Sequence, residues 1–388
     1  MKRLFLIILG MCAVLGAYGQ GVEALLREIE ENNPDLKAAA AALDEERLAN
    51  RSEALLADPE VEFNYLWSNG LGNRHDVRVS QSFDFPTLSG KRAGMAASLD
   101  ELSALDYKAR RLELRQEARH LCIDLIHHHR LLQELNDHLS RASVLVESYE
   151  RRMEAGGSTI LDLNKAKLHQ AAVRGQVNQT ENERLSLLSR LTALNGGKEL
   201  PFTPTAYDLA DTLPPDFETW FSEASAKNPV LAHVRKELEL GQQQLAIDRL
   251  STMPELTVGY MSEIHAEEKF RGVTVGLNIP LWSGANRVKR ARAGVAAAQS
   301  RQDAAQQAFF QELKDLYRQA AAMKAHAEMM RASLSDTDYQ DYLLDALTRG
   351  EISMIDYLVE NDLYFEALEQ TLEAERAYRC ALAELEVF

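Results

Sequence analysis

One segment of this 388-residue chain occurs twice, and that duplication limits the possible folds more than any other feature. The first copy runs from Pro59 to Gly90 and the second from Pro254 to Gly284; each begins Pro-Glu-aliphatic and ends Ser-Gly. An Asn-Pro-x-Leu motif precedes each copy, at Asn33 and at Asn228. The offset is 228 − 33 = 195 residues at this motif and 284 − 90 = 194 at the Ser-Gly end. Such a repeat indicates one structural unit built twice.

Each copy holds two runs in which apolar and polar residues alternate. In the first copy the apolar positions run from Val61 to Trp67 and from Val77 to Phe85, with Gln81 as the exception. The second copy repeats the pattern from Leu256 to Tyr260 and from Val273 to Leu281. A period of two predicts strands, and runs of about 10 residues with one apolar face are typical of membrane barrels. We predict strands at 59–67, 77–86, 254–262 and 272–281; a soluble sandwich of hairpins is the alternative.

The rest of the chain has the apolar periodicity of helices. Apolar residues step by four and three from Leu121 to Met153, and again from Phe309 to Leu334. This heptad spacing predicts helices packed side by side in a coiled coil. The two longest would reach about 95–100 Å, whereas a domain-sized globule is about 30 Å across. We predict helices at 22–57 with an interruption at Asn33, at 88–154, 159–194, 285–348 and 353–385, and one ending at Leu250.

The N-terminus and the breaks between helices predict the domain organisation. Lys2 and Arg3 precede an apolar run and small residues up to Gly19, which is typical of a secretory signal peptide over residues 1–19. The apolar run is too short to span a membrane, and the residues before Cys12 make a poor lipidation motif, so we expect no lipid anchor. We expect a first repeat at 20–195, a proline-rich connector at 196–215 and a second repeat at 216–388.

Four strands are too few to close a barrel in a membrane. An open sheet edge in lipid leaves backbone groups unpaired, at several kcal/mol each. Several copies of the chain would therefore have to share one barrel. Three copies would supply twelve strands, a natural number for an open pore.

Composition excludes several classes of function. The formal charge of −16 argues against nucleic-acid partners. Cys122 and Cys380, which lie in helical pattern outside any CxxC motif, are expected to be buried thiols. No nucleophile elbow, phosphate-binding loop or HExxH motif is present, so we predict neither an enzyme nor a bound cofactor.

The ordered double set of motifs resembles the TolC family of outer-membrane efflux proteins. The matches are the two Asn-Pro-x-Leu motifs, the two Pro…Ser-Gly strand exits, and a glycine followed six residues later by aspartate, at Gly156 and at Gly350. The resemblance covers the whole chain after residue 19 and implies a fold that is mainly α with a transmembrane β part. It implies a homotrimer with a twelve-stranded barrel in the outer membrane and a helical tunnel in the periplasm. The implied partners are an adaptor protein and an inner-membrane pump, with RND the expected type of pump. The size of the chain is most similar to the heavy-metal efflux branch.

The same resemblance points to a gate at the two glycine turns. It implies that Asp162 and Asp356 form carboxylate rings at the periplasmic entrance, where crowding of like charges would raise their pKa values and attract cations. The alternative is a carboxylate favoured at a helix start by the helix dipole. Ile352 and Val359 replace residues that some relatives use in gating, so Arg349 is the candidate for a latch contact. The adaptor-docking tips would be the turns that contain Gly156, Gly157 and Gly350.

Other side chains suggest metal binding or membrane contact. Five histidines lie in one helical stretch, but no carboxylate or thiol completes a compact cluster, so packed or solvated histidines are favoured over a metal site; they are His120, His127, His128, His129 and His138. Aromatic residues near strand ends fit an interfacial belt; they are Tyr65, Trp67, Tyr260 and Trp282. Plain packing accounts for Trp220.

The favoured function is a passive export channel, with two alternatives. A periplasmic coiled-coil adaptor would have one helical hairpin and separate β domains, whereas this chain has two predicted hairpins and two strand pairs. A periplasmic metal-binding protein would require bound metal. The pump, and not this sequence, largely determines which substrate is exported.

Overall fold

The computed structural model describes residues 21–67, 70, 73–83, 86–202, 205–207, 212–265, 268–280, 282, 286–334 and 339–386. The chain divides into two compact units. Unit 1 takes in residues up to Lys37, Arg111–Ser222 and Gln311–Phe388, and unit 2 takes in Ala38–Arg110 and Glu223–Phe310. The predicted signal peptide lies outside the described residues and stays a prediction.

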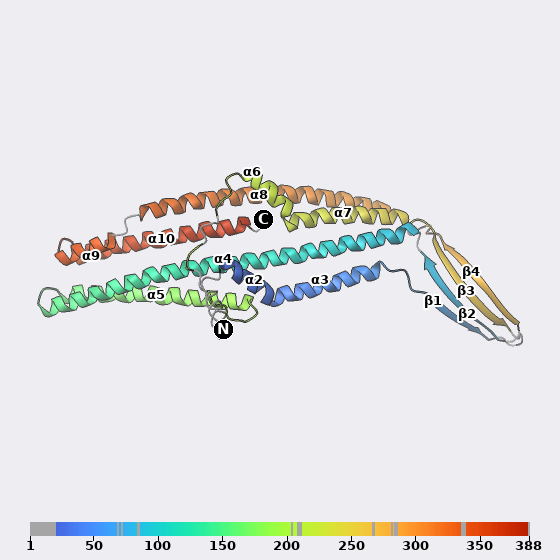
Figure 1. Cartoon of the computed structure of the whole chain (residues 1–388), viewed down its shortest axis with the longest axis horizontal. Coiled ribbons are helices and arrows are strands. Elements are labelled where there is room, and N and C mark those ends of the chain that lie inside the picture. The colour runs from blue at the N-terminus through green and yellow to red at the C-terminus, as the bar shows by residue number, and fades with distance from the viewer. Residues whose placement is uncertain are drawn as a thin grey trace, which may run out of the picture. The chain divides into compact units, whose positions relative to one another are not determined.

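The elements follow one another in the same order in both halves of the chain (Figure 1). The helices of the first half are α2 (Val22–Asn32), α3 (Pro34–Glu53), α4 (Pro86–Glu154) and α5 (Ile160–Leu194). Those of the second half are α6 (Phe217–Lys227), α7 (Pro229–Leu250), α8 (Arg287–Ser333), α9 (Tyr339–Arg349) and α10 (Met354–Glu386). No described helix has a stretch sufficiently long and apolar to cross a membrane.

Unit 2 contains a single antiparallel sheet with the order β1-β2-β3-β4 (Figure 1). Its strands are β1 (Glu60–Leu66), β2 (Arg74–Phe83), β3 (Glu255–His265) and β4 (Glu268–Asn278). The two predicted pairs are thus not separate, because β2 pairs with β3 over ten positions from Arg74↔His265 to Phe83↔Leu256. One sheet is therefore assembled from both repeats.

The observed strand ends correct the predictions. β2, β3 and β4 extend three or four residues further toward the hairpin turns than predicted. Pro86 does not end β2 but begins α4, because proline lacks an N–H and its fixed φ suits the first turn of a helix. β4 ends at Asn278 rather than at 281. Asp84, Phe85, Leu281 and the second Ser-Gly motif lie outside the described residues.

One face of the sheet is apolar, and no other described residues cover it. The register places Val61, Val79, Tyr260 and Val273 in one row across the strands. The twelve large apolar side chains of this face are 37% to 74% exposed; they are Val61, Phe63, Tyr65, Val77, Val79, Phe83, Leu256, Val258, Tyr260, Val273, Val275 and Leu277. A contiguous apolar surface of this kind marks a site of contact with lipid or with another protein.

Apolar side chains between helices form the core of unit 1. α2, α4 and α5 meet in a cluster that includes Leu26, Leu125 and Leu191. α8 and α10 meet around Ala320 and Leu385, and Trp220 packs against this cluster as predicted. Cys122 is buried and Cys380 is half-buried, and both thiols are free.

The prediction of one unbroken helix over 285–348 was wrong. α8 ends at Ser333 and α9 begins only at Tyr339. Leu334 already lies in a turn, and residues 335–338, Ser-Asp-Thr-Asp in the sequence, lie outside the described residues. The first helical region likewise ends at Glu53 rather than at 57.

The Asn-Pro motifs are helix starts. The Asn33 carboxamide oxygen accepts a hydrogen bond from the Leu36 N–H at 2.8 Å, and its nitrogen donates to the Leu194 carbonyl at 2.9 Å. Asn228 repeats the cap, with its oxygen 2.9 Å from the Leu231 nitrogen. Pro34 stands at the first helical position, where its missing N–H has no consequence. Asn33 therefore both begins α3 and satisfies the end of α5.

Replacing Asn33 by alanine is expected to lower the free energy of unfolding by about 2–4 kcal/mol, because a cap is lost and the half-buried Leu194 carbonyl loses its donor. Asn33→Ser keeps the cap but cannot reach Leu194, so about half of the loss is expected. Urea unfolding of the detergent-solubilised protein followed by circular dichroism measures both values. Equal stability of the two variants would contradict the dual role.

Candidate functional site: two equivalent helical turns

The two predicted tips have the same backbone structure. After α4 ends at Glu154, Gly156 takes a φ of +75° and the Gly157 N–H donates to the Arg152 carbonyl at 2.8 Å. After α9, Gly350 takes a φ of +79° and the Glu351 N–H donates to the Ala346 carbonyl at 2.9 Å. This is the Schellman arrangement, in which glycine accommodates the left-handed conformation.

Each turn leads directly into a capped helix. The Thr159 hydroxyl donates to an Asp162 carboxylate oxygen at 2.7 Å and accepts from the Asp162 N–H at 3.3 Å. Ser353 and Asp356 repeat this exchange at 2.6 and 3.2 Å. The spacing between the two turns is 356 − 162 = 194 residues, as in the strand repeats. In the single chain both aspartates therefore cap the start of a helix. Their pore role stays a prediction.

The Asp162 side chain is 30% exposed and its pKa is lowered, chiefly because it accepts the Thr159 hydroxyl hydrogen bond. Lys165 adds a smaller effect, with its ammonium nitrogen 3.6 Å from the carboxylate. This shift is opposite in direction to the rise that crowding of carboxylates by three-fold symmetry would cause. Within one chain, Asp162 is a permanent negative charge at neutral pH.

The two turns lie beside each other in unit 1. Side chains from α4, α5, α9 and α10 share one apolar cluster that includes Tyr149, Leu163, Leu347 and Tyr357. The Arg152 guanidinium donates to the Thr348 carbonyl at 3.1 Å, joining the end of α4 to the end of α9. Both tips are therefore held as a single rigid end.

Exposed apolar residues follow each turn. Ile160 and Leu161 are 57% and 67% exposed, and Ile355, which is equivalent to Leu161, is 55% exposed. A cleft of about 540 Å³ opens between α4 and α9 beside the turns. Its charged lining comes from Arg151, Arg152, Asp341 and Asp345. Arg349 pairs with Asp345 at 2.6 Å within α9, and its predicted latch role stays a prediction.

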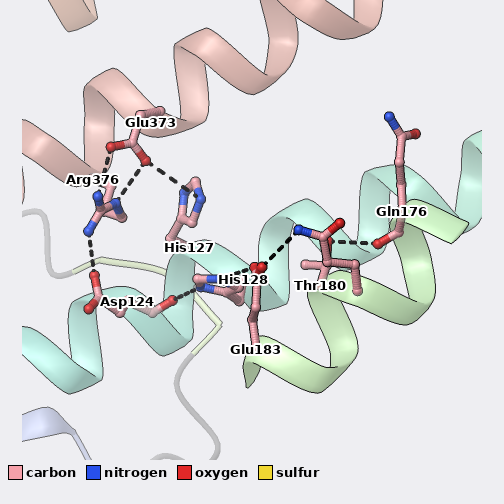
Figure 2. Close-up of polar contacts among 9 residues, drawn as sticks. Asp124, His127, His128, Gln176, Thr180, Glu183, Glu373 and Arg376 are labelled. Atoms are coloured by element: carbon pink, nitrogen blue, oxygen red, sulfur yellow. Dashed lines mark hydrogen bonds and ion pairs between the residues drawn. The ribbon is translucent and has the colours of Figure 1, made fainter. Parts of the chain in front are cut away.

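A second polar cluster in unit 1 joins α4 to α5 and to α10 (Figure 2). The Arg376 guanidinium donates to Asp124 of α4 at 2.7 Å and, through two nitrogens, to Glu373 of its own helix at 2.8 Å. His128 of α4 lies 3.2 Å from Glu183 of α5. This cluster was not predicted from the sequence; it connects the helices that follow the turns, α5 and α10, to α4.

The histidines of α4 have separate surroundings. His127 and His138 are buried, whereas His129 is exposed. Within the described part of the chain, no group of three or more histidine, cysteine or acidic side chains is placed to hold a metal ion. His138 stacks on Phe365 of α10 at 3.6 Å, and its Nε2 lies 3.2 Å from Nε2 of His169 on α5.

Acid is expected to loosen this part of the helical unit. Burial lowers the pKa of His138 to about 3, with smaller effects from His169 and Arg141, and burial also lowers the pKa of His169, against the opposing charge of Asp362. The unfolded chain therefore binds protons below about pH 6.5 that the folded chain does not. Stability should fall as the pH drops from 6.5, by up to about 1.4 kcal/mol per pH unit for each histidine.

The measurement is urea unfolding at pH 7.5 and at pH 5. His138→Gln should reduce the difference between the two pH values, because one shifted group is gone. His129→Gln, at an exposed position of the same helix, is the matched control and should leave the difference unchanged. The same pH dependence in His138→Gln as in the wild type would rule out His138 as its source.

Comparisons with known proteins agree with this fold. No curated protein matches the sequence. Residues 220–387 match the family model described as outer membrane efflux protein. A membrane protein from Pseudomonas aeruginosa has a similar structure, with a TM-score of 0.79, 14% identity, and coverage of 95% of this chain and 93% of that chain.

Two further solved structures show the same likeness. The outer membrane protein VceC from Vibrio cholerae has a TM-score of 0.75 at 15% identity, with coverage of 94% of this chain and 95% of that chain. The open state of the MtrE outer membrane channel from Neisseria gonorrhoeae has a TM-score of 0.73 at 13% identity, with coverage of 94% and 88%. The fold is thus that of TolC-like outer-membrane channels. The second part of the chain, residues 220–387, thus carries an outer membrane efflux protein domain, in line with the predicted resemblance to the TolC family.

Proposed function

We propose that this protein is the outer-membrane channel of a tripartite efflux system, and not an enzyme. One observation carries the proposal: among the described residues, nothing covers the apolar face of the four-stranded sheet, and its outer strands, β1 and β4, each have an unpaired edge. In lipid those edges need partners, at several kcal/mol for each unpaired backbone group. Three copies would pair β4 of one copy with β1 of the next and close twelve strands into a barrel.

The opposite face of the sheet would line the pore, and it is acidic. Arg78 pairs with Glu62 at 3.1 Å, and Arg74 pairs with Glu263 at 2.8 Å. Four further carboxylates on this face have no such ion pair among the described residues; they are Glu60, Asp76, Glu255 and Glu268. A lumen of this charge would favour cations over anions.

The helical turns would form the periplasmic entrance. In a trimer Asp162 and Asp356 would supply six carboxylates near the axis, while the turns at Gly156, Gly157 and Gly350 would present their exposed apolar residues to an adaptor. Through that adaptor the channel would work with an inner-membrane pump, for which the RND type is the proposed class. The homotrimer, the signal peptide without a lipid anchor, the two-repeat domain division and the heavy-metal branch belong to the same proposal.

The alternatives have less support. An adaptor would lack the sheet assembled from two repeats, and the family match and the structural likenesses are to outer-membrane channels. A metal-binding protein has no observation in its favour among the described residues.

The experiment is native mass spectrometry of the protein purified from membranes in detergent, together with gel migration with and without heating. The expected result is a particle three times the mass of the mature chain that migrates faster when unheated. A water-soluble monomer would overturn the proposal.

A further inference from the structure

Two cations interrupt the apolar face of the sheet near its hairpin turns. Lys269 and Arg271 alternate along β4 in phase with Val273, Val275 and Leu277, so all five project from the same face. Both cations are exposed, and neither forms an ion pair with another described residue. A membrane-facing surface is expected to be apolar, so two neighbouring positive charges on it require an explanation.

Both cations lie at the hairpin end of β4, one and three residues after its first residue, Glu268. Across the strands, Lys269 lies in the row of Ile264, His75 and Tyr65, and this row is inclined to the membrane because barrel strands are tilted. Trp67 continues the same alternation of β1 beyond Tyr65 and is 81% exposed. Tyrosine and tryptophan collect at the level of lipid headgroups. Lys269 is therefore at the interface and not in the middle of the hydrocarbon.

The length of the apolar band places the two cations at a similar depth in the membrane. Ile279 is 279 − 271 = 8 residues from Arg271, about 27 Å along a strand and about 20 Å along the membrane normal at a tilt of about 40°. Arg271 therefore lies just inside the edge of an apolar band that is about 25 Å tall in such barrels, and Lys269, two residues further along β4, reaches that edge. At this depth a charged side chain costs about 0–1 kcal/mol, against about 2–4 kcal/mol at the midplane.

The hairpin end of the sheet is the end away from α4 and α8, which are joined to the opposite end of β2 and β4 (Figure 1). On the proposed function those helices extend into the periplasm, so the hairpins face outward and the two cations meet the outer leaflet. The inference rests on the proposed function in this respect.

We propose that Lys269 and Arg271 bind the phosphate groups of an outer-leaflet glycolipid of the lipid A type. Alternate residues on one face are about 7 Å apart, which suits two phosphate contacts on one lipid. The ammonium group of Lys269 acts as a point charge, and the planar guanidinium of Arg271 binds phosphate oxygens through two parallel hydrogen bonds. Closure of the barrel would place the neighbouring copy's strand β1, with its aromatic residues Tyr65 and Trp67, beside β4 to cover the sugar and acyl chains.

The test measures retention of lipid A. Purified protein in nanodiscs of phosphatidylcholine is incubated with bisphosphorylated lipid A, and bound lipid is counted by native mass spectrometry. The double variant Lys269→Gln/Arg271→Gln is expected to bind about tenfold less lipid A or weaker still, since each surface cation contributes to anionic-lipid binding. Lys289→Gln/Arg290→Gln, which removes two exposed cations of α8, should bind as the wild type does.

Unchanged lipid A binding in the double variant would overturn the inference. If the double variant does not assemble, the single variants Lys269→Gln and Arg271→Gln replace it, together with the charge-preserving Lys269→Arg/Arg271→Lys. In that case the inference is contradicted if both single variants bind lipid A as well as the wild type does. Failure of the proposed function would look different, because the wild-type protein itself would then lack trimers and heat-modifiable migration.

Discussion

Gly259→Ala is expected to destabilise the sheet by about 1–3 kcal/mol and to lower the yield of heat-modifiable protein. A Cβ at this position of β3 would lie 2.8 Å from the Val79 carbonyl oxygen and 2.7 Å from the Thr274 hydroxyl oxygen. The threonine side chain can rotate away. The Val79 carbonyl group cannot move away, because it belongs to the backbone of β2. This strand of the first repeat is paired with β3. The extra methyl group therefore forces apart the two halves of the sheet.

Gly272→Ala is the matched control. Gly272 lies on the same polar face in the adjacent strand β4, and a Cβ there would meet nothing within 4 Å. The two variants differ only in the space available for one methyl group. The measurement is the midpoint of urea unfolding by gel migration without heating. Equal midpoints for the two variants would contradict the tight β2–β3 junction.

Arg376→Met is expected to destabilise the helical unit by about 1.5–3 kcal/mol, the range for hydrogen bonds to charged groups. The substitution keeps much of the apolar side chain but removes the donors that join Asp124 of α4 to Glu373 of α10 (Figure 2). Asp124, whose side chain is 23% exposed in the wild-type structure, would lose its guanidinium partner. Because the cluster links α10 to α4, the variant should also populate looser arrangements of the helices that follow the tips.

Arg184→Met is the control for loss of an arginine ion pair. Arg184 pairs with Glu181 three residues earlier in α5, and exposed pairs within one helix contribute only about 0.3–0.5 kcal/mol. Urea unfolding followed by circular dichroism and hydrogen exchange of α10 should separate the two variants. Similar stability of both would show that the contact between α4 and α10 adds nothing beyond an ordinary surface pair.

The strands could be predicted because one face of the sheet is not covered by any other part of the chain that the structure describes. Where only one face is apolar the sequence alternates, and the period of two is visible from Val61 to Trp67. Pairing between β2 and β3 was not predictable, since it joins residues of different repeats and no local turn specifies it. The end of α8 at Ser333 was not predictable from the heptad pattern, because the apolar step continues through Leu334.

The site was predictable in its backbone and not in its polar contacts. Gly156 and Gly350 mark the turns, and a hydroxyl residue three positions before each aspartate marks the caps. The Asp124–Arg376 contact spans 252 positions, and a charged residue in the middle of a long helix looks the same in sequence whether it faces water or another helix. A pore role for Asp162 and Asp356 depends on neighbouring copies, so it needs an experiment on the assembly.

Ion conduction by the purified protein in a planar lipid bilayer tests whether copies of this chain enclose a channel. Wild-type protein that migrates in a heat-modifiable manner should give discrete current steps, with reversal potentials in a salt gradient that indicate a preference for cations. Asp162→Asn/Asp356→Asn should weaken that preference while the steps persist. Correctly assembled wild-type protein that inserts into the bilayer but never gives current steps above the detergent control would contradict the channel.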